Sequence, residues 1–281
     1  MIYLWMAIII VSCYLIGNIN FARIFTWELK RKDITKEGSG NPGMTNVLRT
    51  HGLGMAILTM IFEFIKGGVP ALIAASIMDK YYPGMFYVVD LTAGLAAMLG
   101  QIYPVIYKFK GGKGVAVFVG VFFFSPLWWV ALSLFFIFAV ISFFVKYGAH
   151  INLPYIFLMS GAVTIYNIFW GAQAPYWWIA IILVWTMFLL EIYMHRKNIQ
   201  RLWHKRENKI DFEKSLKEFW EKLTKTKQIA SDQKVENVDD KPENEIVVED
   251  DDEEEIMEEY NDVDDGITTD EIIDNEELFE D

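Results

Sequence analysis

The amino-acid sequence predicts an all-α protein that crosses a membrane several times. Hydrophobic residues make up 53% of the 281 residues, and from Ile2 to Tyr193 they form successive long runs with few charges. A helix needs about 20 apolar residues to cross roughly 30 Å of hydrocarbon. The seven expected spans are Ile2–Phe25, Met55–Met78, Met85–Tyr107, Val115–Val130, Leu132–Tyr147, Pro154–Trp170 and Pro175–Tyr193. The fourth and fifth are short, so one long helix is the alternative there, and the alternative totals are six or eight spans.

Basic residues indicate the orientation of these spans. No Lys or Arg precedes Arg23, which argues against a cleavable signal peptide. With seven spans, one side of the membrane receives almost all the basic loop residues, and the opposite side receives only Lys80. Under the positive-inside rule, we expect the N-terminus outside the cell and the C-terminus in the cytoplasm.

The net charge of −12 arises at the end of the chain. Residues 249–281 hold 19 of the 37 acidic residues and no basic residue. The low isoelectric point therefore says nothing about the partners of the basic, apolar body. The single cysteine, Cys13, excludes an internal disulfide. The four histidines show no spacing typical of zinc sites, so we expect no metal.

The composition divides the chain into three regions: a transmembrane domain over 1–200, a basic amphipathic juxtamembrane segment over 201–230 and an acidic tail over 231–281. A basic helix with aromatic residues on one face is typical of a segment lying along an anionic membrane surface. A solvated helix packed on its own domain is the alternative. The tail composition predicts disorder and a solubilising role rather than a specific partner. The residues that share the apolar face are Phe212, Leu216, Phe219, Trp220 and Leu223.

The first polar loop, residues 38–46, reads Gly-Ser-Gly-Asn-Pro-Gly-Met-Thr-Asn and is followed by Arg49. Glycines allow successive backbone N–H groups to point into one concavity that binds anions. Ser39, Thr45 and Asn46 add neutral donors. Arg49 adds a planar charged group suited to phosphate oxygens. An ordinary flexible loop is the alternative.

The second polar loop is Phe109-Lys110-Gly111-Gly112-Lys113-Gly114-Val115-Ala116, which leads directly into an apolar run. Lysines and free N–H groups at the start of a helix favour phosphate binding. The loop is not a Walker A motif, because Gly114 stands where Ser or Thr is required, so nucleotide hydrolysis is not predicted. We favour phosphate binding for Lys113 and a role in membrane topology alone for Lys108.

The third polar segment follows the last predicted span. His195, Asn198 and Arg201 recur every three residues and share one side of a helix, and Glu207 lies beyond them. Polar residues that merely end a transmembrane helix are the alternative. Within the second span, Glu63 and Lys66 predict a buried pair that supports the site, with snorkelling to the membrane surface as the alternative.

These three segments resemble the motifs of the acyl-phosphate:glycerol-3-phosphate acyltransferase (PlsY) family of bacterial membranes. Gly38–Asn46 with Arg49 looks like the first motif and Phe109–Ala116 like the second, while His195, Asn198, Arg201 and Glu207 resemble the third. The similarity covers residues 1 to about 207 and leaves out the tail. The His-x4-Asp pattern of another large class of membrane acyltransferases is absent. The fifth position after each histidine holds Ala56, Tyr155, Gln200 and Lys209.

The resemblance implies transfer of a fatty acyl group from acyl phosphate to the 1-hydroxyl of glycerol 3-phosphate. The products would be lysophosphatidic acid and inorganic phosphate, in phospholipid biosynthesis. The implied partners are acyl phosphate, glycerol 3-phosphate and membrane lipids, with the acyl-phosphate-producing enzyme as a candidate protein partner and no nucleic acid. The implied location is the plasma membrane, with the active site on the cytoplasmic face. No cofactor is implied.

The resemblance also assigns roles by position. The catalytic residues would be Ser39, Arg49, Lys113, His195 and Asn198. The substrate-binding residues would be Gly38, Gly40, Asn41, Gly43, Thr45, Asn46, Lys110, Gly111, Gly112, Gly114 and Arg201. The supporting residues would be Glu63, Lys66, Gln101 and Glu207.

Several positions depart from the family pattern. The most consequential is Gln101, which stands where the family has a histidine and cannot carry a proton as histidine can. A catalytically altered or inactive relative that binds phosphate-bearing lipids or precursors is therefore one alternative function. A small-anion transporter is another, disfavoured because the polar motifs cluster at one face and no internal repeat is visible. The other departures are Asn18 and Asn20 in place of Ser and Pro, Glu63 in place of Asp, and Ala149 and Asn152 in place of serines.

Overall fold

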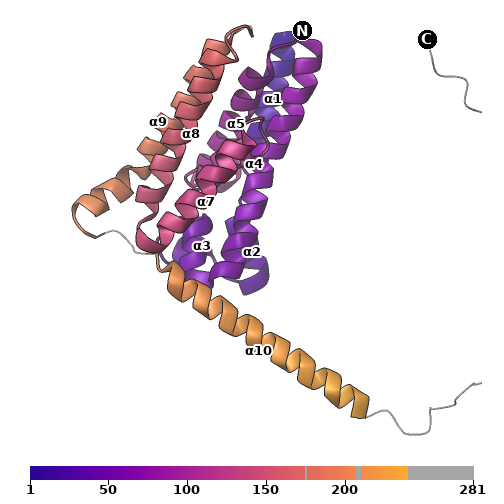
Figure 1. Cartoon of the computed structure of the whole chain (residues 1–281), viewed down its shortest axis with the longest axis vertical. Helices are drawn as coiled ribbons and strands as arrows, with labels where there is room; N and C mark the ends of the chain where they lie inside the picture. Colours follow the sequence, from indigo (N-terminus) through magenta and orange to yellow (C-terminus); the bar gives the residue numbers. More distant parts are fainter. Residues whose placement is uncertain (175, 207–209, 240–281) are drawn as a thin grey trace, which may run out of the picture. The chain divides into compact units, whose positions relative to one another are not determined.

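The computed structural model describes residues 1–174, 176–206 and 210–239, and within them every regular element is a helix. The chain divides into two compact units, Met1–Thr224 and Lys225–Asp281. In the first unit, the long helices run side by side, with α2 and α3 gathered at one end (Figure 1). The α-helices are α1 (Ile2–Gly17), α2 (Phe21–Lys30), α3 (Met44–His51), α4 (Leu53–Tyr81), α5 (Phe86–Ile102), α6 (Val115–Phe123), α7 (Trp128–Phe144), α8 (Gly148–Phe169), α9 (Trp177–Trp203) and α10 (Phe212–Asp239). Two short 3-10 helices are η1 (Ile34–Lys36) and η2 (Val105–Tyr107).

The prediction of an all-α, multi-pass membrane protein is confirmed. Among the described residues, five helical stretches are long and apolar enough to cross a membrane, and α7 is a shorter apolar helix. The expected fourth span is only the nine-residue helix α6, about 14 Å long at the usual rise per residue. One long helix across the fourth and fifth spans is excluded, because the chain turns between Phe124 and Leu127, where Pro126 cannot continue the helix. The five stretches are Ile2–Lys30, Leu53–Tyr81, Phe86–Tyr107, Gly148–Phe169 and Trp177–Trp203.

The expected first span is interrupted. Helix α1 ends at Gly17, and α2 begins at Phe21. Asn20 causes the restart, because its side chain accepts a hydrogen bond of 2.9 Å from the backbone N of Arg23 and so caps α2. Asn18 holds the break against η2, which follows α5, since its Oδ1 accepts a 2.5 Å hydrogen bond from the backbone N of Val105. Asn18 and Asn20, two of the positions that depart from the motif pattern, therefore form the corner between α1 and α2.

Small residues let α6 pack directly against α4. Any side chain on Gly68 of α4 would meet the backbone of Gly120 on α6, and any on Gly120 would meet the backbone of Phe64. Lipid provides no hydrophobic driving force for helices to associate, so close backbone contacts of this kind stabilise the packing of transmembrane helices. Helix α6, which begins where the second polar loop ends, is thereby fixed to α4.

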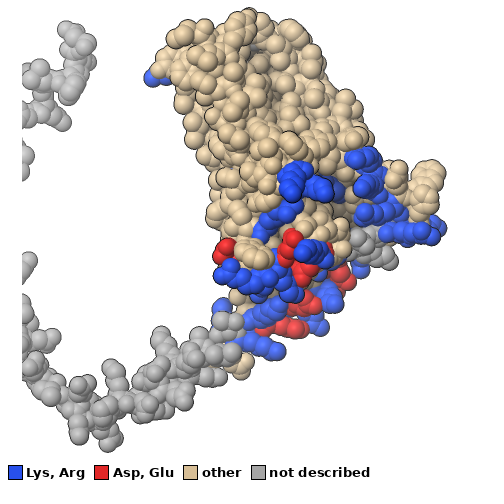
Figure 2. Space-filling model, turned by 180° about the vertical axis from the view of Figure 1, so that it is seen from behind, with Lys and Arg blue, Asp and Glu red and all other residues tan. Residues whose placement is uncertain are grey.

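Basic side chains gather around one end of the first unit, where α2, α3 and the end of α9 lie (Figure 2). The charge separation expected from the sequence is therefore present, while the orientation across the membrane stays a prediction. Helix α10 continues to Asp239, so the first residues of the expected acidic tail are helical. The rest of the tail, residues 240–281, lies outside the described residues.

Candidate active site

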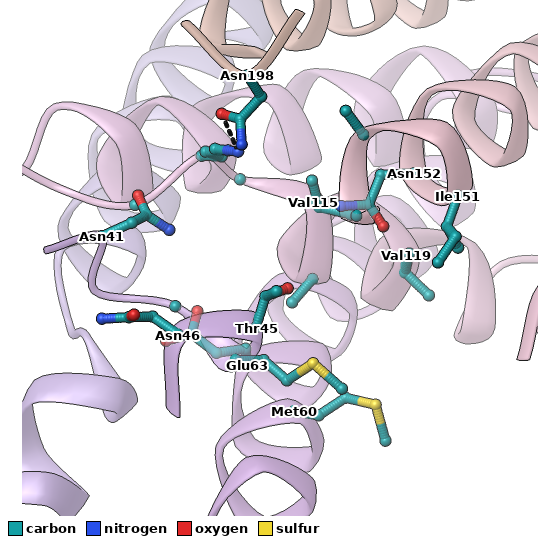
Figure 3. A pocket seen from close by; sticks show the side chains of 18 of the residues that line it. Asn41, Thr45, Asn46, Met60, Glu63, Val115, Val119, Ile151, Asn152 and Asn198 are labelled. Atoms are coloured by element: carbon teal, nitrogen blue, oxygen red, sulfur yellow. Dashed lines mark hydrogen bonds between the residues drawn. The ribbon is translucent and has the colours of Figure 1, made fainter. Parts of the chain in front are cut away.

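A cavity of about 710 Å³ opens where the polar loops meet the helices. One part of its wall is polar, and the other is apolar, formed by residues of α4, α6, α7 and α8. Figure 3 shows Asn41 and Asn198 on one side, with Val119 and Ile151 on the other. The predicted site residues that line it are Ser39, Gly40, Asn41, Gly43, Thr45, Asn46, Arg49, Glu63, Gln101, Gly111, Gly112, Lys113, Gly114, Asn198 and Arg201. The sequence thus identified most of the polar wall.

Asn46, in the first turn of α3, holds the first polar loop in place. Its Oδ1 accepts hydrogen bonds from the backbone N (2.8 Å) and the Oγ (3.1 Å) of Ser39. Its Nδ2 donates to the carbonyl oxygens of Ile34 (3.2 Å) and Glu37 (2.9 Å). Gly38 has a φ of +55°, and a side chain there would collide with the Asn46 amide. Asn46 therefore shapes the loop, and Ser39 is oriented by it.

Acidic groups beside the first loop are already engaged. Glu37 lies 2.7 Å from Nε2 of His51 and 3.2 Å from Nζ of Lys32. Asp33 starts η1, and its carboxylate accepts hydrogen bonds from Thr35, which holds the pKa of Asp33 below its usual value. These carboxylates thus have cationic or hydrogen-bonding partners of their own.

The second polar loop is fastened next to the first. Nη2 of Arg23 donates a 2.9 Å hydrogen bond to the carbonyl of Lys110, and the guanidinium lies 4.4 Å from the centre of the Tyr107 ring. The backbone N of Gly112 donates to the carbonyl of Gln101 at 2.9 Å. A side chain on Gly112 would stand 3.1 Å from the carbonyl of Pro42, in the first loop. Gly112 of the second loop therefore lies directly beside Pro42 of the first loop.

The second loop ends at Lys113 and Gly114, directly before α6. Nζ of Lys113 donates a 2.7 Å hydrogen bond to Oδ1 of Asn198 on α9, drawn as the dashed line beside Asn198 in Figure 3. Gly114 has a φ of +103°, and a side chain there would lie 2.8 Å from Cγ of Met98 and 3.1 Å from Oε1 of Glu191. Only glycine suits this position, and the loop is thereby held against α9 and α5.

His195 lies behind the cavity rather than in its wall. It is fully buried, and its Nδ1 stands 2.9 Å from the carbonyl oxygen and 3.2 Å from the Oε2 of Glu191. Glu191 is equally buried. The predicted catalytic histidine is therefore part of a buried pair that supports the loop around Gly114 and the α9 turn bearing Asn198.

Glu63 and Lys66 form the expected buried pair and do not snorkel. Nζ of Lys66 is 2.6 Å from Oε2 of Glu63, and each side chain is only 2% exposed. The same ammonium donates to Oε1 of Gln101 at 2.7 Å and to the carbonyl of Ile19 at 2.6 Å. Oε1 of Glu63 accepts from the backbone N of Phe21 at 3.0 Å. This network joins the corner between α1 and α2 to Gln101, which lines the cavity.

Some predicted residues lie elsewhere. Four of them lie outside the cavity wall: Gly38, Lys66, Lys110 and His195. Each contacts a residue of the wall directly or through one intermediate residue. Glu207 lies outside the described residues. The sequence assigned no site role to Arg23, Asn20 or Glu191. Arg23 fastens the second loop through Lys110, and the Nδ2 of Asn20 fastens the first loop by a 3.0 Å hydrogen bond to the carbonyl of Pro42. Asn20 carried one usable signal, because asparagine is a favoured residue at the start of a helix.

The chain resembles known glycerol-3-phosphate acyltransferases over most of its length. The family model described as glycerol-3-phosphate acyltransferase matches residues 7–205. The glycerol-3-phosphate acyltransferase of Shouchella clausii is 37% identical over 204 residues, which cover 70% of this chain and 92% of that protein. The one from Aquifex aeolicus is 37% identical over 202 residues, covering 72% of this chain and 97% of that protein.

Two solved structures have the same fold. One is PlsY (YgiH), an integral membrane glycerol 3-phosphate acyltransferase, in its glycerol 3-phosphate form, with a TM-score of 0.62 and 33% identity. The other is its lysophosphatidic acid form, with a TM-score of 0.60 and 32% identity. Each alignment covers 75% of this chain and 98% of the solved chain. The resemblance inferred from the three motifs is therefore confirmed, and the chain belongs to the glycerol-3-phosphate acyltransferase family.

Proposed function

We propose that this protein transfers an acyl group from acyl phosphate to the 1-hydroxyl of glycerol 3-phosphate, releasing lysophosphatidic acid and inorganic phosphate. One observation carries the proposal. A single cavity has cationic groups and glycine loops on one side and an apolar wall of α4, α6, α7 and α8 on the other. Two phosphates and a fatty chain need such a pair of environments side by side.

The polar wall suits two phosphate groups. Arg49 offers a planar fork for phosphate oxygens, and Lys113 a compact positive charge held by Asn198. The backbone N–H groups of Ser39 and Gly112 already donate within the protein and shape the two loops. Thr45 and the backbone N–H groups at the start of α6 add neutral donors. Together these groups offset the repulsion between the donor phosphate and glycerol 3-phosphate. Arg201, also in the wall, adds a further positive charge.

In the proposed reaction, the hydroxyl oxygen of glycerol 3-phosphate attacks the carbonyl carbon of the acyl phosphate. The new ester bond forms, and the bond between that carbon and the phosphate oxygen breaks. The hydroxyl proton leaves with the phosphate, so the protein needs no strong base. Acyl phosphate is an activated anhydride, and positioning with charge stabilisation then supplies most of the catalysis. Lys113 and the backbone N–H groups at the start of α6 stabilise the oxyanion that develops on the carbonyl oxygen.

Gln101 fits this scheme as a neutral hydrogen-bond donor. Its Oε1 accepts from the Lys66 ammonium, and its Nε2 amide, which also hydrogen-bonds to the Glu63 carboxylate, lies on the side that faces Gly112 and the cavity. A donor of this kind stays uncharged at every pH. The role given to the family histidine is therefore filled by an amide whose direction is set by Lys66. His195 acts in this scheme as a positioning residue through Glu191 and the turn that carries Asn198.

Phosphate release from purified protein supplied with acyl phosphate and glycerol 3-phosphate tests the proposal. We expect release that depends on both substrates, with lysophosphatidic acid formed in equal amount. Arg49→Ala is expected to lower the rate strongly, and full turnover by that variant would overturn the assignment of the site. Binding of glycerol 3-phosphate without turnover would instead identify an inactive relative. Uptake of glycerol 3-phosphate into sealed vesicles without acyl donor would identify a transporter.

We further propose that the cavity opens to the cytoplasm from the plasma membrane. The concentration of basic residues at the end that bears the polar loops supports this orientation. The single natural cysteine, Cys13, is buried, which favours labelling at introduced cysteines. In intact cells, a membrane-impermeant thiol reagent is expected to label Lys80→Cys and to spare Lys36→Cys. The reverse pattern would overturn the orientation.

A further inference from the structure

A segment beyond the family domain contributes to the cavity wall. The family match ends at residue 205, and the chain continues through Ile210 into α10. Ile210 and Phe212 both line the cavity, and both belong to the compact unit Met1–Thr224. The active cavity of this protein is thus completed by residues that lie outside the matched family region.

Ile210 is anchored on two sides. Its backbone N donates a 2.7 Å hydrogen bond to the carbonyl of Lys146, between α7 and α8. Its side chain is 4% exposed and belongs to an apolar cluster with Val47 and Leu48 of α3. Its Cδ1 also lies 3.4 Å from the position that a side chain on Gly148 would take. Ile210 therefore links the helix of the first polar loop to the turn before α8.

The first turns of α10 extend this apolar wall. The ring of Phe212 is 6.3 Å, centre to centre, from the ring of Phe143 near the end of α7. Two turns further along the same face, the ring of Phe219 lies 3.4 Å from the position of a side chain on Gly54, at the start of α4. The segment thus contacts α7 and α4, two of the helices that line the cavity.

We propose that Ile210 and Phe212 exclude water from the reacting carbonyl and so determine that the acyl group goes to glycerol 3-phosphate rather than to water. The inference rests on the proposed function. In the competing reaction, water attacks the same carbonyl carbon, and the same bond to phosphate breaks, which yields a fatty acid and inorganic phosphate. An enclosed apolar wall suppresses such hydrolysis of a reactive donor.

The selectivity follows from the two kinds of wall. Glycerol 3-phosphate carries a phosphate that Arg49 and the glycine loops can hold, whereas water brings no group that compensates for leaving bulk solvent. Apolar side chains beside the polar wall therefore penalise water more than the anchored alcohol. Substitution of Ile210 or Phe212 is therefore expected to change the ratio of fatty acid to lysophosphatidic acid more than the total rate of phosphate release.

Full-length Phe212→Ala and Ile210→Ala test this inference. Phosphate release from palmitoyl phosphate is measured with and without glycerol 3-phosphate, and lysophosphatidic acid and free fatty acid are quantified. We expect the ratio of fatty acid to lysophosphatidic acid to rise roughly tenfold, equivalent to a small change in relative barrier heights. Trp220→Ala is the matched control, since it removes an aromatic ring from the same helix at a position that is 59% exposed.

Fatty acid formed in the absence of protein is subtracted, so the ratio reports only the two protein-catalysed reactions. Phe212→Leu keeps an apolar side chain and is expected to restore a ratio near that of the unaltered protein. An unchanged ratio in both alanine variants, with transfer still present, would overturn this inference and leave the proposed function intact. If the unaltered protein consumes no acyl phosphate at all, the proposed function fails and this inference fails with it.

Discussion

Nζ of Lys113, in the glycine loop before α6, lies 2.7 Å from Oδ1 of Asn198 on α9. The two residues are 85 positions apart in sequence, and this hydrogen bond aims the lysine into the cavity wall between the two glycine loops. Four predictions follow from this contact and from the buried groups around it.

Loss of Lys113 is expected to reduce turnover severely. Removing one group that stabilises a developing oxyanion costs roughly 10²- to 10³-fold in rate, and we expect Lys113→Met to fall in this range. Asn198→Ala should have a smaller effect, because it only releases the ammonium from its position. Since both variants act through one contact, the double variant should be no slower than Lys113→Met alone. Steady-state phosphate release measures all three, and fully additive losses would contradict a shared role.

Gly114→Ala is expected to lower activity about tenfold or more, as a strained left-handed residue costs of the order of 1–2 kcal/mol and displaces the loop. The added methyl group would meet Met98 at 2.8 Å and Glu191 at 3.1 Å. Gly161→Ala is the matched control, because no atom lies within 4 Å of the position its methyl group would take. Turnover and thermal stability are measured for both. Equal behaviour of the two variants would show that Gly114 has no special role.

Lys66→Met is expected to destabilise the fold by about 3–5 kcal/mol, because it leaves the Glu63 carboxylate buried without its cation. The double variant Glu63→Leu, Lys66→Met removes both charges and should be markedly more stable than Lys66→Met. Denaturant unfolding in detergent micelles gives the free energy of unfolding of each. A single variant as stable as the unaltered protein would mean that the pair contributes nothing to the fold.

Gln101→His is expected to make activity more dependent on pH, because a titratable imidazole replaces an amide that stays neutral. Neutral imidazole can accept the hydrogen bond from Lys66, so activity near pH 8 should stay within about threefold of the unaltered protein. Protonation of the new imidazole would place a second cation against the Lys66 ammonium and remove its acceptor, so activity should fall as the pH decreases. Turnover measured from pH 5.5 to 8.5 on both proteins checks this. A variant much faster than the natural protein at pH 8 would instead indicate that Gln101 marks a weakened relative.

Local sequence patterns determined the class of fold and most of the polar wall. Long apolar runs can satisfy their backbone hydrogen bonds in a membrane only as helices, so the all-α architecture follows directly from composition. Glycine loops flanked by Arg49 and Lys113 likewise indicated anion binding from residue types alone. Composition did not determine the number of spans, because a short helix such as α6 depends on its packing against α4 rather than on its length.

Long-range contacts decided what each polar residue does. The sequence could not distinguish His195, buried against Glu191, from Asn198, which faces the cavity only three residues later. It also could not show that Gln101 receives a hydrogen bond from Lys66 or that Ile210 returns to the cavity wall. Periodicity and composition describe neighbours along the chain. Burial and pairing depend on which distant segments meet, and these are fixed only when the helices pack.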